Sequence, residues 1–465
     1  MTLSTDDTIV AIATPPGQGG VGIVRLSGPH AWAIGQHLFV RQQPGNIRSH
    51  QLMYGQIIDP ATKLALDDGL IAFMRAPHSY TGDDVAEINA HGSPLILQRI
   101  VEAALAQGAR AAEPGEMTLR AFLHGRIDLA QAEAVADLIA ANSDAAARQA
   151  MSQLAGQLSQ EVQRARIAIM RVLAPIEASI DFPEEEVPTP DRAELAATLT
   201  SAEMVVTTLL AGAEQGRIAR EGVRCVITGR PNVGKSRLLN HLLRTERAIV
   251  TAIAGTTRDT IEETALLGGV AFHLIDTAGI ADTADPIERI GIARSRDAMA
   301  GADLALLVLD RATPLTESDR QIAQELVDLG FGTAHRPLLM ILNKSDLPVA
   351  LTNKALQDLP TAPTIMTSLV TAEGLAQLED LMVTSALGGA ANESAALVAR
   401  ARHREALRAA SAALAAAQTT LRDGLPLDLV AEDLHDALHS LGLITGESVT
   451  EDLLSSIFSE FCIGK

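Results

Sequence analysis

The sequence of 465 residues is poor in aromatic side chains and in cysteine. Phe, Trp and Tyr make up only 2% of the chain, whereas alanine and leucine are abundant, and this balance favours helices over a β-sandwich or barrel. Two cysteines exclude a disulfide framework and agree with a reducing compartment. At roughly 100–200 residues per domain, the length predicts about three domains.

Positive charge is also scarce. The chain has 37 Lys and Arg against 57 Asp and Glu, a net charge of −20, so no global positive field exists to hold nucleic acid or anionic lipid. Any polyanion must therefore be bound locally. The acidic start, Asp6-Asp7, lacks the basic segment of a signal peptide, and we expect no apolar run approaching ~20 residues. These features predict a soluble cytoplasmic protein without a membrane segment.

The composition and the hydrophobic periodicity of the sequence change along the chain, and these changes predict its domains. Residues 1–120 alternate short β-branched runs with helical ones, which predicts an α+β domain. Residues 121–220 are rich in Ala, Leu and Gln at helical spacing, residues 221–387 alternate strands and helices as in a parallel α/β domain, and residues 388–465 are helical again. Because the last segment forms a marginal domain alone, we expect it to pack with 121–220, leaving the α/β domain as an insertion into a discontinuous helical domain.

The strands expected from these patterns are Thr8–Ala13, Gly22–Ser27, Leu52–Ile58, Gly69–Phe73, Val85–Asn89, Val223–Thr228, Ala271–Ile275, Leu304–Leu309, Pro337–Leu342 and Pro363–Thr367.

A phosphate-binding motif lies at the start of the third segment. Gly229-Arg-Pro-Asn-Val-Gly-Lys-Ser236 matches the P-loop pattern, follows an apolar strand and precedes a helical run, which is the context that the motif requires. Its glycines let backbone N–H groups face phosphates, Lys235 reaches the β/γ oxygens, and the Ser236 hydroxyl coordinates Mg²⁺.

Three further motifs follow in the order expected of a GTPase. Thr257 in Gly-Thr-Thr-Arg-Asp259 offers a second hydroxyl to Mg²⁺, and Asp276 in Asp-Thr-Ala-Gly279 offers a carboxylate at the end of a strand. Asp346 in Asn-Lys-Ser-Asp can accept hydrogen bonds from both N1–H and the amino group of guanine, a pair that adenine cannot supply. The four motifs predict a Ras-like P-loop domain that takes GTP rather than ATP.

The residue that orients water in Ras-like enzymes, a glutamine just after the Asp-x-x-Gly motif, is replaced here by Ile280. An aliphatic side chain cannot orient water, so a cation, a partner or an acid further along must do so. The acidic candidates are Asp282, Asp285 and Glu288.

Three weaker signals are set aside. Gly17-Gln-Gly-Gly-Val-Gly22 fits a dinucleotide fingerprint but precedes an apparent strand, and no acid follows at the required distance. Cys462-Ile-Gly-Lys465 has the spacing of a prenylation box, but Gly464 is not aliphatic and Lys is not a usual last residue. Arg400, Arg404 and Arg408 share one helical face that could bind RNA or a partner, although a solvated face is the simpler interpretation.

Motifs at both ends give the sequence a resemblance to one family. The opening segment 7–28, Ser79-Tyr-Thr-Gly-Asp-Asp84, the stretch from Pro114-Gly-Glu-Met through Asp128-Leu-Ala-Gln-Ala-Glu133, and Phe461-Cys-Ile-Gly-Lys465 together resemble the MnmE (TrmE) family of tRNA-modification GTPases. The resemblance covers essentially the whole chain. It implies an amino-terminal tetrahydrofolate-binding and dimerisation domain, a discontinuous helical domain and an inserted G domain.

The resemblance also implies partners and cofactors. The family works as a homodimer with an FAD- and NADH-dependent partner, MnmG, to build an aminomethyl-type group on C5 of the wobble uridine of certain tRNAs. A tetrahydrofolate, in the 5-formyl or 5,10-methylene form, supplies the one-carbon unit. Its GTPase needs Mg²⁺ and K⁺, with K⁺ acting where other systems use an arginine finger.

Site residues are carried over by motif. The resemblance implies K⁺ ligands at Asn232, Thr251, Ile253 and Thr256, and a folate pocket lined by Arg25, Glu87, Arg126 and Lys465. The implied catalytic set is Lys235, Thr257, Arg258, Asp259, Glu288 and Cys462, with Glu288 orienting the attacking water through a bridging water. The implied GTP-binding residues are Asn232, Val233, Gly234, Lys235, Ser236, Arg237, Thr251, Ala252, Ile253, Ala254, Gly255, Thr256, Thr257, Asp276, Thr277, Ala278, Gly279, Asn343, Lys344, Asp346, Ser368 and Leu369.

Two positions depart from the family pattern. Thr367-Ser-Leu369 stands where a Ser-Ala pair usually contacts guanine, and Ala281 stands where a basic residue often follows the Asp-x-x-Gly motif. The competing function is a GTP-switched ribosome or assembly factor without modifying activity, because the central domain alone does not distinguish the two.

Overall fold

The structure, a computed structural model, describes residues 6–43, 45–181, 191–245, 263–276, 299–388 and 397–465. The chain divides into two compact units. Unit 1 comprises residues 1–136 and 438–465, and unit 2 comprises residues 137–437. Unit 1 therefore combines two segments that are distant in sequence, whereas unit 2 is one continuous segment.

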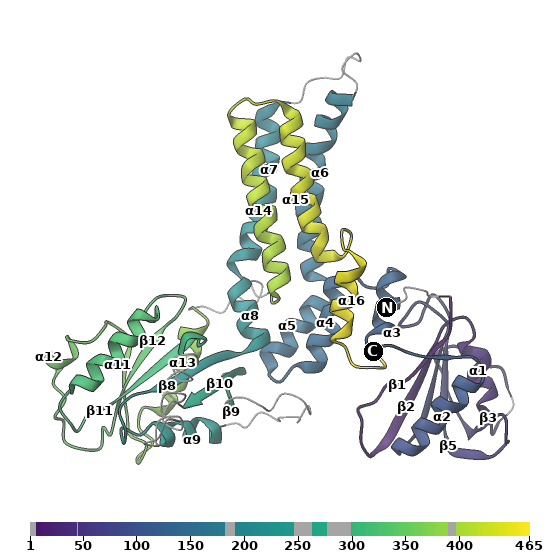
Figure 1. The fold of residues 1–465 in the computed structure, drawn as a ribbon, viewed down its shortest axis with the longest axis horizontal. Coiled ribbons are helices and arrows are strands. Elements are labelled where there is room, and N and C mark those ends of the chain that lie inside the picture. Colours follow the sequence, from purple (N-terminus) through teal and green to yellow (C-terminus); the bar gives the residue numbers. More distant parts are fainter. Residues whose placement is uncertain (1–5, 44, 182–190, 246–262, 277–298, 389–396) are drawn as a thin grey trace, which may run out of the picture. The chain divides into compact units, whose positions relative to one another are not determined.

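Unit 1 is built on a seven-stranded sheet covered on one face by α1 (Ala31–His37) and α2 (Pro94–Ala106) (Figure 1). Neighbouring strands are antiparallel except for the parallel pair β1–β7. Alternate apolar side chains such as Val24, Phe73 and Ile88 point into the core beneath the helices, which gives the strands their period of two. In spatial order the strands are β3 (Phe39–Arg41), β4 (Leu52–Ile58), β5 (Ala65–Met74), β6 (Val85–Gly92), β2 (Gly19–Ser27), β1 (Ile9–Ile12) and β7 (Arg110–Ala111).

Helical segments from both ends of the sequence complete unit 1. Helix α3 (Glu116–Leu123) contacts α16 (Glu451–Ser459), and the rings of Phe122 and Phe458 lie 6.4 Å apart. Gly464 adopts φ +93°, and a Cβ there would lie 2.3 Å from the Ile12 carbonyl oxygen. The C-terminal tail thus packs so closely on β1 that only glycine fits at this position.

A buried charge cluster joins the start of unit 1 to α3. The Arg120 side chain is 1% exposed and donates hydrogen bonds to Asp7 and to Glu116, the latter at 3.2 Å. Asp83 lies 3.6 Å from Arg120, and its Oδ2 accepts a hydrogen bond from Ser27. The diagnostic segments 79–84 and 114–117 therefore meet in one network of buried charges.

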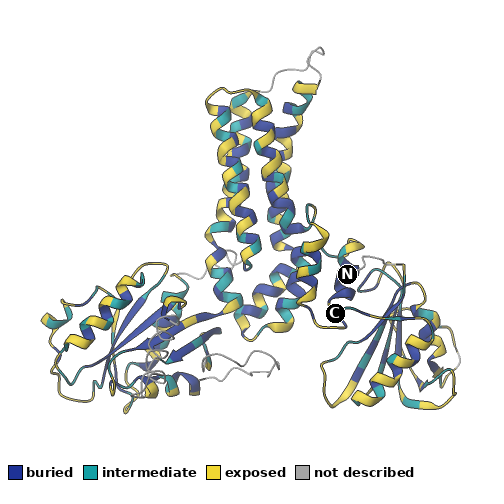
Figure 2. Ribbon diagram, in the orientation of Figure 1, coloured by how far each residue is buried: buried dark blue, intermediate teal, exposed yellow. Residues whose placement is uncertain are grey.

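In unit 2, α7 (Arg192–Ala211) packs against both α6 (Gln157–Asp181) and α14 (Ala401–Arg422). Figure 2 shows buried positions on the sides of these helices that face one another. Because α14 follows the α/β domain in sequence while α6 and α7 precede it, the discontinuous helical domain is confirmed. Two shorter helices, α5 (Asp144–Leu154) and α8 (Ala213–Glu221), contact each other beside this bundle.

The expectation that no apolar run approaches 20 residues was wrong. The helical run Arg192–Glu221 is long and apolar enough, by length and composition alone, to cross a membrane. Its side chains Leu195, Leu199 and Val206 are buried in the helical domain, although only 33% of its most apolar stretch is buried.

The inserted domain is a six-stranded sheet with helices α9 (Lys235–Thr245), α11 (Glu317–Asp328), α12 (Asn353–Leu356) and α13 (Leu375–Ala386) (Figure 1). Its central strands are buried on both faces, as parallel sheets covered by helices require. In spatial order the strands are β13 (Thr364–Thr367), β12 (Leu338–Asn343), β11 (Leu304–Asp310), β8 (Val223–Thr228), β10 (Val270–Asp276) and β9 (Glu263–Leu267). All are parallel except β9, which pairs antiparallel with β10 at the edge.

All ten expected strands are present within a few residues of their predicted ends. The sequence patterns missed β3, β7 and β9. The first two have only three and two residues, too few to show alternation, and β9 is an edge strand whose residues alternate weakly.

Asp137 binds one arginine before the inserted domain and one after it. Its carboxylate accepts a hydrogen bond of 2.9 Å from Arg220 Nε, in the last turn of α8, and one of 2.8 Å from Arg400, the N-cap residue of α14. The Asp137 side chain is 6% exposed, so both bonds form away from bulk water. One carboxylate therefore binds residues on both sides of the inserted domain.

We predict that Asp137→Ala destabilises unit 2 by about 2 kcal/mol, because two largely buried arginines lose their shared counter-ion. Urea unfolding should be followed by circular dichroism and by fluorescence of Trp32, the single tryptophan, which lies in unit 1. The dichroism midpoint should fall while the Trp32 midpoint stays. Glu405→Gln, which breaks only an exposed pair with Arg408, serves as the control. An equal shift of the dichroism midpoint in Asp137→Ala and in Glu405→Gln would contradict the prediction.

We also predict an acid-sensitive step in unit 1. Although burial disfavours the charged form, hydrogen bonds from Arg110 and Arg120 outweigh it and hold the pKa of Asp7 below its ordinary value of 3.8. A lowered folded-state pKa adds stability above pH 3.8 that is lost as the pH falls through the folded value. Asp7→Asn should therefore flatten the acid limb of a Trp32 fluorescence titration, whereas Asp6→Asn, an exposed neighbour, should leave that limb intact.

Candidate functional site

The predicted nucleotide motifs meet at one edge of the second sheet. The P-loop follows β8, Asp276 ends β10, Asp310 ends β11, Asn343 ends β12 and Thr367 ends β13. Because these five strands are parallel, their carboxyl ends lie together. This edge is where open α/β sheets bind ligands.

The P-loop wraps around the ammonium group of Lys235. Nζ donates hydrogen bonds of 2.7 Å to the Gly229 carbonyl and 2.9 Å to the Arg230 carbonyl, and the residue is only 6% exposed. Gly234 has φ +112°, and a Cβ there would lie 2.3 Å from Asn343 Nδ2. Asn232 adopts φ +66°, a conformation that Asn tolerates better than most residues, and its side chain is exposed. The loop is thus held in the curled shape that phosphate binding requires.

A hydroxyl and a carboxylate converge beside the P-loop. Ser236 Oγ donates a 3.0 Å hydrogen bond to Asp276 Oδ2 at the end of β10. Both are hard oxygen ligands of the kind that Mg²⁺ prefers, so their convergence fits the expected metal position. The next P-loop residue, Arg237, is exposed on the first turn of α9.

The Asn-Lys-Ser-Asp segment is locked to the rest of the site. Asn343 Nδ2 donates a 2.7 Å hydrogen bond to the Val233 carbonyl, which joins this segment to the P-loop. Lys344 Nζ pairs with Asp310 at 2.7 Å. Ser368 Oγ donates a 2.6 Å bond to Asp346 Oδ1, so the serine of the departing Thr-Ser-Leu sequence orients the carboxylate expected to bind guanine. Leu369 lies against Gly234, where it packs on the P-loop.

Several expected site residues lie outside the described residues: Thr251, Ala252, Ile253, Ala254, Gly255, Thr256, Thr257, Arg258, Asp259, Thr277, Ala278, Gly279 and Glu288, with Ile280, Ala281, Asp282 and Asp285. Their roles stay predictions.

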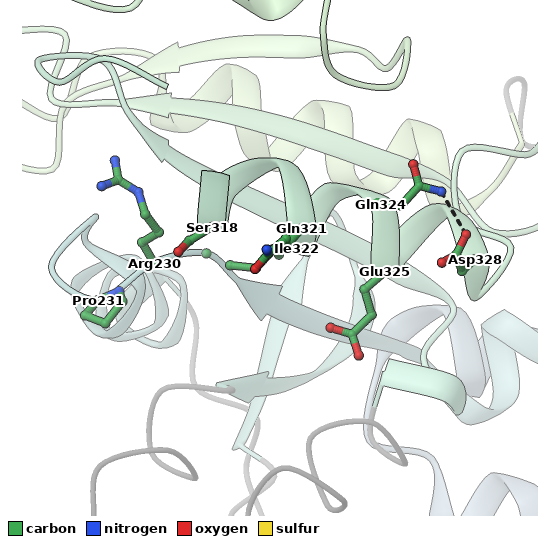
Figure 3. A pocket seen from close by; sticks show the side chains of 9 residues that line it. Arg230, Pro231, Ser318, Gln321, Ile322, Gln324, Glu325 and Asp328 are labelled. Atoms are coloured by element: carbon green, nitrogen blue, oxygen red, sulfur yellow. Dashed lines mark hydrogen bonds between the residues drawn. The ribbon is translucent and has the colours of Figure 1, made fainter. Parts of the chain in front are cut away.

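A hollow of about 710 Å³ lies beside the P-loop and is lined by Gly229, Arg230, Pro231 and one side of α11 (Figure 3). Its described lining includes neither Lys235 nor Ser236 nor Asp276, so it is distinct from the phosphate cradle. Glu325 and the hydrogen-bonded pair Gln324 and Asp328 line the part of the hollow farther from the loop (Figure 3).

A second polar group lies in unit 1, around the C-terminal tail. Arg25 Nε pairs with Glu87 at 2.6 Å, and Arg25 also donates a 3.3 Å bond to the Gly464 carbonyl. Burial and the nearby charge of Arg25 lower the pKa of the Lys465 ammonium, while Glu87 opposes this shift. The structure thus brings together two cationic side chains, Arg25 and Lys465, and the carboxylate of Glu87.

Arg126 is not joined to this group. It is exposed in the turn after α3, and within the described part of the chain no hydrogen bond or ion pair links its side chain to the other three residues. Tyr80, which the sequence did not single out, lies under the Arg25 guanidinium at 5.8 Å from its ring centre.

The two cysteines differ in environment. Cys225 is buried in β8, and burial raises its pKa far above the usual range, in agreement with a packing role. Cys462 is exposed, and its carbonyl accepts a hydrogen bond from the Gly115 N–H at 3.4 Å. The thiol of Cys462 is therefore accessible.

The arginine face on α14 is not a free basic patch. Arg400 is bound to Asp137, and Arg408 pairs with Glu405 at 3.7 Å. Of the three residues considered for RNA binding, two already have acidic partners within the chain.

Sequence reasoning missed two sets of polar residues that shape the sites. The buried Arg120 cluster stiffens unit 1 beneath segment 79–84, and its long-range pairs leave no periodic signal. Arg230 of the P-loop pairs with Asp319 of α11 at 2.7 Å. The capping-box sequence from Thr316 to Asp319 could have located the helix start, but not its arginine partner.

Two models of known protein families match consecutive parts of the chain. A family model described as "GTP-binding protein TrmE N-terminus" matches residues 8–126, and one described as "MnmE helical domain" matches residues 129–462. A tRNA modification GTPase MnmE from Chloroflexus aurantiacus is 50% identical over 99% of this chain and 100% of its own length. A protein of the same description from Geotalea uraniireducens is 44% identical over 99% of each chain.

Among solved structures, the G domain of the T. maritima FeoB iron transporter is 27% identical over 35% of this chain and 98% of that chain, with a TM-score of 0.27. The full-length identity and the match to 129–462 identify the family: the chain belongs to the MnmE family of tRNA modification GTPases.

Proposed function

We propose that the chain hydrolyses GTP to drive formation of an aminomethyl-type group on C5 of the wobble uridine of certain tRNAs. One observation carries the nucleotide part of this proposal: Lys235, the Ser236–Asp276 pair and the Asp346–Ser368 pair lie along one sheet edge. In the proposed complex Lys235 contacts the β/γ-phosphates and Asp346 accepts two hydrogen bonds from guanine. Membership of a tRNA modification family favours this function over that of a GTP-switched assembly factor.

Two metal ions belong to the proposed site. Ser236, Thr257 and Asp276 would hold Mg²⁺, and the described Ser236–Asp276 contact fits that role. Asn232, together with Thr251, Ile253 and Thr256, would hold K⁺. A monovalent cation at the β/γ bridge neutralises developing charge without a protein side chain, which fits the loss of the usual glutamine at Ile280. Glu288 would orient the attacking water, and Thr257, Arg258 and Asp259 complete the proposed catalytic segment.

We propose that unit 1 binds a tetrahydrofolate derivative that provides the one-carbon unit. Arg25, Glu87 and Lys465 would line its pocket, because a set of basic and acidic side chains suits a ligand with an anionic glutamate tail and a guanine-like pterin. Arg126 would have to reach the ligand from its exposed turn. The accessible thiol of Cys462, next to Lys465 in this tail, is the proposed participant in the modification chemistry.

The proposed assembly is a cytoplasmic homodimer that joins MnmG and tRNA. The net charge of −20 supports a division of labour in which MnmG provides much of the grip on tRNA. We propose boundaries at 1–120, 121–220, 221–387 and 388–465 for the folate-binding, first helical, G and second helical segments.

Asp346→Asn should exchange guanine for xanthine specificity. The amide donates where the carboxylate accepted, so GTP binding should weaken at least 100-fold while xanthosine triphosphate is hydrolysed in its place. Steady-state hydrolysis of both nucleotides measures this change. Asp358→Asn, at an exposed pair with Arg320 in the same domain, should change neither rate. Unaltered GTP turnover in Asp346→Asn would remove the proposed base contact.

Hydrolysis should depend on the monovalent cation and on Glu288. Replacing K⁺ with Na⁺ at equal ionic strength should slow GTP turnover at least tenfold, and Glu288→Ala should lower kcat with little change in KM, because a water-orienting group acts in the transition state. Stopped-flow phosphate release measures both. Equal rates in Na⁺ and K⁺, or an unaffected Glu288→Ala enzyme, would contradict the proposal.

Ligand binding to unit 1 should raise its stability. Saturating 5-formyltetrahydrofolate should raise the midpoint of Trp32-detected thermal unfolding, as linkage requires for a ligand of the folded state. Arg25→Gln should abolish most of that rise, because the guanidinium and its hydrogen bond to the Gly464 carbonyl in the C-terminal tail are lost. Arg41→Gln, on strand β3, is the matched control. A rise that persists in Arg25→Gln would place the ligand elsewhere.

A further inference from the structure

The direction of the Lys235 ammonium is fixed by two backbone carbonyls. Its Nζ donates to Gly229 and to Arg230 at 2.7 and 2.9 Å. An ammonium has three N–H donors in tetrahedral arrangement, so bonds to two fixed acceptors set the direction of the third. The position of the Arg230 peptide therefore contributes to the direction in which Lys235 points its charge.

The Arg230 peptide is in turn anchored through its side chain. Arg230 Nε donates a 2.7 Å bond to Asp319 Oδ1 on α11, and its terminal nitrogen donates a 3.1 Å bond to Thr313 Oγ1 in the turn after β11. The two acceptors lie on different segments, so the guanidinium is held at two points. A lysine in its place could not reproduce this fork.

Asp319 is well placed to serve as an anchor. It is 1% exposed, and its second oxygen accepts hydrogen bonds from the backbone N–H and the hydroxyl of Thr316, at 2.9 and 2.7 Å. These bonds close the capping box that begins α11. The carboxylate is thus fixed by the helix before Arg230 binds it, and little freedom is lost when the pair forms.

We infer that Arg230, clamped by Asp319 and Thr313, is a positioning residue that aims Lys235 at the phosphates of the nucleotide. Arg230 itself extends away from the loop beside the hollow along α11, with Pro231 and Ser318 nearby (Figure 3). It therefore acts through its carbonyl and through Lys235. This inference rests on the proposed role of Lys235 as a phosphate ligand.

The test measures binding of GDP and of a non-hydrolysable GTP analogue to the full-length chain by titration calorimetry, together with kcat and KM for GTP. Arg230→Gln should weaken both ligands about tenfold, the loss expected for a charge-assisted hydrogen bond to a site group. Asp319→Asn should weaken them similarly, and the double variant no more than either single one, because the pair acts as one unit. Arg230→Lys should restore part of the loss, since it keeps the charge opposite Asp319.

Arg320→Gln is the matched control, because Arg320 is the next residue on α11 and pairs only at the exposed surface. It should bind both ligands as the unaltered chain does. If Arg230→Gln impairs folding, Thr313→Val removes one of the two anchors, leaves the ion pair, and should still weaken binding by about threefold.

A positioning role is separated from a merely structural one by the Lys235→Ala background. There Arg230→Gln should cause no further loss, since its effect passes through Lys235. The inference would be overturned if Arg230→Gln still weakened nucleotide binding tenfold when combined with Lys235→Ala. It would also be overturned if Arg230→Gln alone left nucleotide binding unchanged. Either result would leave the nucleotide site as proposed. If Lys235→Ala itself binds both ligands normally, the proposed nucleotide site fails.

Discussion

A single carboxylate, that of Asp137, binds one arginine on each side of the inserted α/β domain. Arg220 lies where the chain enters the insertion and Arg400 where the chain leaves it, so the carboxylate joins both to the helices, in addition to bonds such as that from Arg192 to the Leu425 carbonyl. Burial makes this arrangement demanding, because a buried charge costs several kcal/mol unless it is fully paired. The two arginines supply that pairing.

In the nucleotide site, too, polar side chains join segments that are distant in sequence. Parallel strands bring the carboxyl ends of β8, β10, β11, β12 and β13 to one edge, where side chains that follow different strands bond to one another's segments. Asn343 bonds the P-loop, Ser368 bonds Asp346, and Ser236 bonds Asp276. These bonds restrict the side chains they join, and such restriction lowers the entropy cost of binding a ligand.

The sequence predicted most of this arrangement and missed a defined part. Strands such as Leu52–Ile58 and Val223–Thr228 have clear periodicity and turn signals at their ends, so their positions were predicted exactly. The Gly229–Ser236 pattern carries its geometry within eight residues. Pairs such as Arg230–Asp319 and Arg120–Asp7 join residues that are 89 and 113 positions apart, and no local pattern encodes them. Arg400 was judged from its helical face alone, although its partner Asp137 lies 263 positions earlier.

The account makes one chain responsible for both a GTP site and a one-carbon site that serve tRNA modification. The most direct test is mass spectrometry of nucleosides in tRNA from a strain that lacks this protein, complemented with the unaltered gene or with Lys235→Ala. We predict that the C5-aminomethyl-type wobble uridine disappears, returns with the unaltered gene and stays absent with Lys235→Ala. Unchanged tRNA in the deletion strain, or full rescue by Lys235→Ala, would contradict the account.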